Sequence, residues 1–100
     1  MLRRDEMDAK TKRFDMVSML DSDEAIKEYF SQVMEDGDSE EIVRALGYIA
    51  RARGMTQLAK DTGLGREILY KALAPETSPR FETILKVTRA LGLKFTVIRA

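Results

Sequence analysis

The stretch MTQLAKDTGLGREILYKAL, residues 55–73, decides how this chain folds. Two glycines, Gly63 and Gly65, interrupt a run whose apolar residues otherwise recur at helical spacing. Each glycine would cost about 1 kcal/mol in the interior of a helix, so one continuous helix is disfavoured. The sequence instead predicts two short helices, over about 56–62 and 66–74, joined by a tight turn in which Gly63 is left-handed.

The residues that bound these two segments agree with a helix–turn–helix arrangement. Thr56 is a favourable N-cap for the first helix, and Gly65 is an acceptable N-cap for the second. Pro75 cannot continue the second helix, because its ring removes a backbone donor and clashes with the preceding turn. Helical spacing points Leu69 and Leu73 inward, which leaves an outer face that carries Gly65, Arg66, Glu67, Tyr70 and Lys71.

Three further helices are expected, over about 22–36, 39–53 and 79–91. Asp21 is expected to cap the first of them, and Asp38 or Ser39 the second. Gly37 is expected to stop the first in a left-handed conformation, and Gly92 is expected to stop the last. The last segment changes to strand formers, among them Phe95, Val97 and Ile98. Because a lone strand is unstable in water, we expect this segment to pair with its copy in a second chain or with an edge strand of a partner protein.

The chain is therefore expected to form one compact all-α domain of about five helices with a short C-terminal β-strand. Its expected layout is a flexible N-terminal tail over 1–14, an N-terminal helical extension over 15–38, a helix-turn-helix core over 39–92 and the strand over 93–100. A length of 100 residues suits a single domain of this kind.

The composition argues against catalysis. The chain has no cysteine and no histidine, which removes thiolate chemistry, zinc–thiolate sites and the commonest general base. No nucleophile–base pair stands at a suitable spacing, so we expect no enzyme, no cofactor, no metal and no small-molecule substrate. The apolar runs are too short to span a membrane and no secretory signal opens the chain, so a soluble cytoplasmic protein is expected.

The zero net charge hides an asymmetry along the chain. Residues 1–38 hold 6 Lys/Arg against 11 Asp/Glu, a net charge of −5, and residues 39–100 hold 11 against 6, a net charge of +5. The basic part can meet an anion, while the acidic part can face a basic partner or lie against the basic part. Ordinary solvating charge is the alternative explanation.

Two short helices joined by a glycine corner form the arrangement that places a second helix in the major groove of DNA. Arg66 can bind guanine through two hydrogen bonds, and Glu67 can accept one from cytosine. The predicted base-reading residues are Gly65, Arg66, Glu67 and Lys71. The residues predicted to contact phosphate or to support the site are Thr56, Gln57, Tyr70 and Arg53, with Arg44 and Arg51 as weaker candidates.

Each of these residues also has a purely structural explanation. Arg66 and Lys71 can be ordinary solvated helix residues. Arg66 and Tyr70 stand four apart, so they can simply stack on each other. Gln57 can cap the backbone of its own helix instead of touching a phosphate. Spacing alone does not choose between these explanations.

Four stretches carry a resemblance to a known family: ALGYIARARGMTQLAKDTGL (45–64), REILYKAL (66–73), SPRFETILKVTRALGLKF (78–95) and the preceding helix end YF…EDGD (29–38). Over about 14–100 the chain resembles the addiction-module antidote proteins, small antitoxins of the Xre, lambda-repressor-like helix-turn-helix class. It departs from many relatives in the broad class in two places. Thr56-Gln57 runs straight into Leu58-Ala59, and Gly65 stands where Ser or Thr is common.

The resemblance implies an antitoxin that neutralises a co-encoded basic toxin of the RelE/ParE-like kind. It also implies a homodimer that represses its own operon by binding a palindromic double-stranded DNA operator, with the bases read by the start of the second motif helix. Two alternatives are a stand-alone phage-type transcriptional repressor and a protein-binding helical module without DNA binding.

Overall fold

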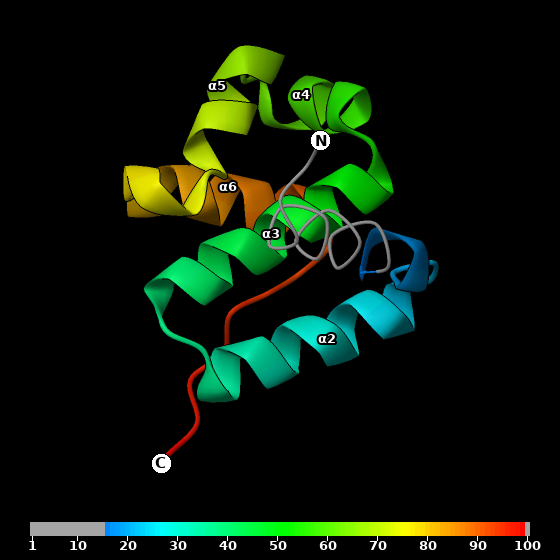
Figure 1. Ribbon diagram of the computed structural model, residues 1–100, viewed down its shortest axis with the longest axis vertical. Coiled ribbons are helices and arrows are strands. Elements are labelled where there is room, and N and C mark those ends of the chain that lie inside the picture. Colours follow the sequence, from blue (N-terminus) through cyan, green and yellow to red (C-terminus); the bar gives the residue numbers. More distant parts are fainter. Residues whose placement is uncertain (1–15, 100) are drawn as a thin grey trace, which may run out of the picture.

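The computed structural model describes residues 16–99, apart from the side chain of Pro75, and this part of the chain is helical with short connections (Figure 1). Residues 16–19 are helical, and the further helices are α2 (Asp23–Asp36), α3 (Ser39–Arg53), α4 (Met55–Thr62), α5 (Arg66–Ala72), the 3₁₀ helix η1 (Pro75–Thr77) and α6 (Phe81–Ala90). Within residues 16–99 there is no strand, and the prediction of an all-α helical bundle is confirmed. The tail predicted over 1–14 lies outside the described residues.

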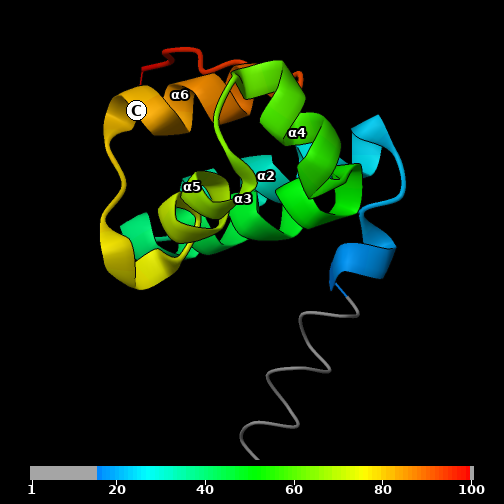
Figure 2. The same ribbon diagram turned by 90° about the horizontal axis from the view of Figure 1, so that it is seen from above.

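Helix α3 is the centre of the bundle. Figure 1 shows α2 along one side of α3 and the pair α4–α5 on the other, and Figure 2 shows α6 packed beside α4. The most deeply buried large side chains come from α3, α5 and α6, and they are Leu46, Ile49, Leu69, Val87 and Thr88. Ile26 and Phe30 of α2 belong to the same apolar cluster, so α2 is part of the common core. None of the described helices is long and apolar enough to cross a lipid bilayer.

The start of α2 and the cap of α3 are set by side-chain oxygens. The Asp38 carboxylate accepts a hydrogen bond from the Glu41 backbone N–H at 2.9 Å, as predicted for the start of α3. The prediction of Asp21 as the cap of α2 is wrong, because the helix begins one residue later. Ser22 caps it instead, its hydroxyl accepting from the Ala25 N–H at 3.1 Å.

Gly37 ends α2, but the predicted left-handed conformation is wrong. Its backbone is extended, with φ −83° and ψ 150°. A Cβ at this position would lie 2.6 Å from the Val33 carbonyl oxygen, which is too close for any side chain. Glycine is therefore required at this turn by the close approach of the preceding helical turn and not by the sign of φ.

The turn between α4 and α5 forms as the sequence predicts. Gly63 is left-handed at φ 74° and ψ 7°, and its N–H donates to the Ala59 carbonyl at 3.0 Å. Gly65 is the N-cap of α5, in an extended conformation. The prediction of Thr56 as the cap of α4 is wrong, because α4 begins at Met55 with Gly54 as its N-cap.

The C-terminal part of the structure agrees with the prediction from the sequence up to Gly92 and differs from it afterwards. α6 ends at Ala90 and Gly92 is left-handed at φ 77°, as expected for the stop. The strand predicted over 93–100 is absent from residues 93–99 of the single chain, since no other strand lies within the described residues to pair with it. Phe95 instead packs against the rings of Phe30 and Phe81, with centroid distances of 6.3 and 6.4 Å.

Replacing Gly63 by alanine should destabilise the fold by about 1–2 kcal/mol, because a residue with a Cβ is strained in the left-handed region. A Cβ at Gly63 would meet nothing within 4 Å, so the cost is conformational and not steric. Gly65→Ser is the matched control: the space there is equally open, φ is −70°, and a serine hydroxyl can cap α5. Urea unfolding should show a loss for Gly63→Ala and none for Gly65→Ser, and equal stability of the two variants would contradict this view of the turn.

Candidate nucleic-acid interface

The pair α4–α5 lies at one end of the molecule, and α2 lies at the opposite end (Figure 1). Helix α5 is held to the bundle by Leu69, which is fully buried, and by Leu73 just beyond its end, which is 5% exposed. Burial of this apolar side fixes the rotation of α5 about its own axis. The other side of α5 faces solvent and carries the exposed residues Arg66, Glu67, Ile68, Tyr70 and Lys71.

Tyr70 lies near two guanidinium groups. The guanidinium carbon of Arg66 is 5.9 Å from the centre of the Tyr70 ring, and that of Arg51 is 5.8 Å from it. The predicted stacking of Arg66 on Tyr70 is therefore present, and Arg66 remains exposed. Arg51 comes from α3, and its position beside Tyr70 adds a third cation to the solvent face of α5. Spacing along the sequence did not show this position of Arg51, because a contact between α3 and α5 leaves no signal in either helix alone.

The charge on the two helices is mixed. α4 and α5 together carry three basic and two acidic side chains, namely Lys60, Arg66, Lys71, Asp61 and Glu67. Arg51 makes the face more basic than these two helices are by themselves. A surface of this kind can contact a small number of phosphates. Its affinity for DNA would therefore fall only moderately as the salt concentration rises.

The residues predicted to support the site are not all free to do so. Gln57 donates a hydrogen bond from its side-chain nitrogen to the Asp61 carboxylate at 2.9 Å, so it bonds to a side chain of its own helix and not to the backbone. Thr56 is exposed in the first turn of α4. The structure therefore leaves Thr56 available to a ligand and holds Gln57 in an exposed, replaceable contact.

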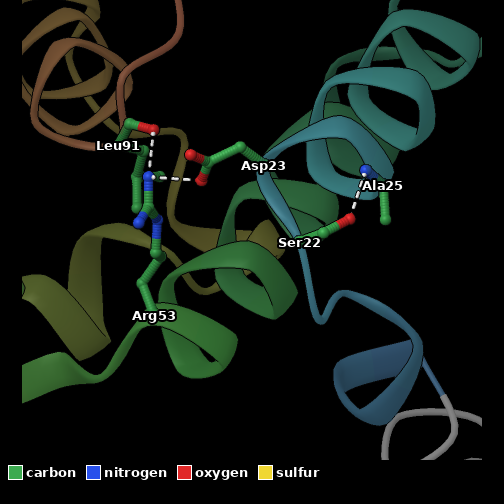
Figure 3. Close-up of polar contacts among 5 residues, drawn as sticks. All are labelled: Ser22, Asp23, Ala25, Arg53 and Leu91. Atoms are coloured by element: carbon green, nitrogen blue, oxygen red, sulfur yellow. Dashed lines mark hydrogen bonds and ion pairs between the residues drawn. The ribbon is translucent and has the colours of Figure 1, made fainter.

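Arg53 ties three helices together (Figure 3). Its Nη2 atom donates to the Leu91 carbonyl oxygen at 3.3 Å and lies 3.0 Å from an oxygen of Asp23. These partners belong to the end of α6 and the start of α2, and not to α4 or α5. The geometry gives Arg53 a structural contact that the sequence could not show, because both partners are distant along the chain, and the phosphate contact predicted for Arg53 stays a prediction.

Helix α2 presents a different, acidic surface. Its exposed side chains include five carboxylates and one ammonium group, which are Asp23, Glu24, Glu28, Glu35, Asp36 and Lys27. On its other side, burial raises the pKa of the Tyr29 phenol above its usual 10, with a further contribution from Tyr48 and an opposing one from Arg44. Among the described residues no three carboxylates, histidines or cysteines gather to hold a metal ion, and the acidic residues of α2 form a charged face.

Comparison with known proteins gives one family. A family model described as probable addiction module antidote protein matches residues 10–99. An uncharacterized protein of Haemophilus influenzae is 45% identical over 91 residues, which cover 91% of this chain and 94% of that protein. No solved structure matches the chain. The match to the family model extends over every labelled helix of the bundle and over the segment that follows α6, up to residue 99.

Replacing Tyr70 by leucine should lower the free energy of unfolding by about 1 kcal/mol, because exposed contacts between a cation and an aromatic ring contribute about 0.5–1 kcal/mol each. Tyr70→Phe keeps the ring and is the matched control. Urea unfolding of the two variants beside wild type measures the difference. If Tyr70→Leu were as stable as Tyr70→Phe, the two arginines would not depend on the ring.

Proposed function

The chain belongs to the family of probable addiction module antidote proteins, and from this premise we propose that it is a DNA-binding antitoxin. It neutralises a co-encoded RelE/ParE-like toxin and, as a dimer on a palindromic operator, represses its own operon in the cytoplasm. The family supports a regulatory and not a catalytic role. In this proposal α4 and α5 form a helix-turn-helix of the Xre, lambda-repressor-like class.

The observation that supports DNA binding is the solvent-facing side of α5. Leu69 is fully buried, so α5 turns its polar side outward, as a helix that enters the major groove must. Gly65, Arg66, Glu67 and Lys71 would read bases from this helix. Thr56 at the start of α4, with Gln57 once its contact to Asp61 opens, would contact phosphate.

Tyr70 and Arg51 would act by positioning Arg66. The ring that lies near both guanidinium groups restricts the conformations of the Arg66 side chain before DNA binds. A side chain that is already ordered loses less entropy when it forms two hydrogen bonds with guanine. Arg51 would also contribute positive charge toward the phosphates that flank the recognised base.

The acidic face of α2 would contact the toxin. It lies at the end of the molecule opposite α5, so a protein bound to α2 and a duplex bound to α5 would not compete for the same surface (Figure 1). Glu24, Glu28 and Glu35 are exposed and fall on one side of the helix by their spacing of four and seven residues. A row of carboxylates of this kind suits a basic partner.

The proposed DNA binding is tested by a gel shift on a duplex taken from immediately upstream of the coding sequence. Wild type should bind it, and the affinity should fall as salt rises because phosphate contacts release counterions. Arg66→Ala should weaken binding by about 1–3 kcal/mol and relax one base preference. Arg89→Ala, which removes an exposed arginine from α6, is the control of equal charge and should bind as wild type does.

Two results would contradict the proposed DNA binding. Binding of Arg66→Ala that is as tight and as selective as wild type would show that Arg66 reads no base. Absence of any salt-sensitive binding would favour the protein-binding module without DNA recognition.

The proposed toxin binding is tested by co-purification with the product of the adjoining reading frame. Deleting 15–38 is unsuitable, because Ile26 and Phe30 of α2 are part of the core and the bundle would unfold. Glu28→Lys with Glu35→Lys keeps the core and reverses the charge of the acidic face, and it should lower toxin affinity by at least tenfold. Asp61→Lys with Glu82→Lys makes the same change in charge on α4 and α6 and should leave toxin binding intact. Equal binding by both double variants would show that the α2 face is not the toxin contact, and failure of the wild-type chain to retain any toxin would favour a stand-alone repressor.

A further inference from the structure

An apolar groove of about 550 Å³ lies away from α4 and α5. It is formed by the end of α2, the start of α3, the region of η1 and the start of α6. Its apolar lining includes Val43, Ile84 and Phe95, and the side chains of Met34 and Phe81 beside it are 41% and 69% exposed. Large apolar side chains left open around a groove mark a place where another apolar surface binds.

The segment that follows α6 has apolar side chains without a cover. Phe95 anchors this segment against Phe30 and Phe81, and it also lines the groove. Beyond that anchor, Val97 is 97% exposed and Ile98 is 83% exposed. Residues 96–99, here called the C-terminal tail, therefore leave the bundle at the edge of the groove without filling it.

The charges of the tail and the groove are opposite. Two carboxylates, Glu40 and Glu76, stand among the groove-lining residues, and both are exposed. Arg99 is exposed at the described end of the tail, and the exposed Lys94 precedes the tail. Val97 and Ile98 match the apolar part of the groove in chemistry, and the basic side chains match its carboxylates.

We propose that the tail of one copy lies in the groove of a second copy, and that the second copy returns the same contact. Every chain has one groove and one tail, so a two-fold dimer fills both grooves and covers both tails at once. A different protein would fill the groove and leave Val97 and Ile98 exposed. The inference deepens the proposed function, since it names the interface of the dimer that would bind a palindromic operator.

This interface leaves the DNA surface free. None of the groove-lining residues belongs to α4 or α5. The described end of the tail points away from those helices (Figure 1). A dimer built through the tails can therefore present two copies of α5 to one duplex.

Sedimentation velocity over a range of protein concentrations tests the interface. Wild type should sediment as a dimer, and Val97→Asp with Ile98→Asp should weaken the dimer at least a hundredfold and yield monomer. The circular dichroism of that variant should match wild type, because the two side chains contribute little to the fold of the single chain. Met19→Asp, at an apolar side chain that is 65% exposed and does not line the groove, should stay dimeric. A monomeric wild type, or a double variant that dimerises normally, overturns the proposal.

Cross-linking separates exchange into the groove from pairing of the two tails with each other. The chain contains no cysteine, so single cysteines can be introduced cleanly. Ile98→Cys chains mixed with Met34→Cys or Ser39→Cys chains should form mixed disulfides, since a disulfide needs Cα atoms within about 7 Å. Disulfides between two Ile98→Cys chains without the mixed product would mean that the tails pair as strands, and would overturn the proposal.

These experiments use no DNA, so failures of the two proposals can be told apart. A tail-dependent dimer that does not bind the upstream duplex would support the proposed interface and refute the proposed DNA binding. A chain that binds the duplex while the aspartate variant remains dimeric would support the proposed DNA binding and refute the proposed interface.

Discussion

The complete burial of Leu69 against the bundle is the constraint on which the arrangement of this molecule depends. A helix as short as α5 has little stability of its own and takes its orientation from the side chains that it buries. Gly63 permits the reversal of direction that brings Leu69 to the core, because its left-handed backbone closes α4 in a single residue. Once Leu69 is inside, Arg66, Tyr70 and Lys71 have to face solvent. The same packing brings Tyr70 near Arg51 of α3, so the core also determines which arginines meet on the outer face.

Local patterns in the sequence were sufficient for much of this fold. The glycine turn, the Asp38 cap and the stop at Gly92 each depend on residues within one turn of the helix end, and the structure confirms them. Two features that could not be predicted depend on distant segments. Arg53 bonds to Asp23 and Leu91, which lie 30 and 38 positions away along the chain. The strand predicted over 93–100 is not formed in residues 93–99 of the single chain for a related reason, since strand formers make a strand only where a second strand is available.

The surfaces of the molecule are divided among its helices in a way that suits several partners. α5 presents Arg66 and Tyr70 beside Arg51 of α3, α2 presents carboxylates, and the groove near α6 presents apolar side chains. All three surfaces rest on the common core around α3. They consist of different residues, so no two of the proposed partners need the same side chains. Arg53 joins the end of α3 to α2 and α6, which couples the acidic helix to the rest of the bundle (Figure 3).

The central claim is that the outer face of α5 is the DNA-binding surface, and the backbone amide spectrum of the labelled protein tests it most directly. Titration with the upstream duplex should shift the amide signals of residues 65–71 and of the start of α4, and it should leave those of α2 unchanged. Shifts confined to α2 or to the segment after α6, with residues 65–71 unaffected, would contradict the claim.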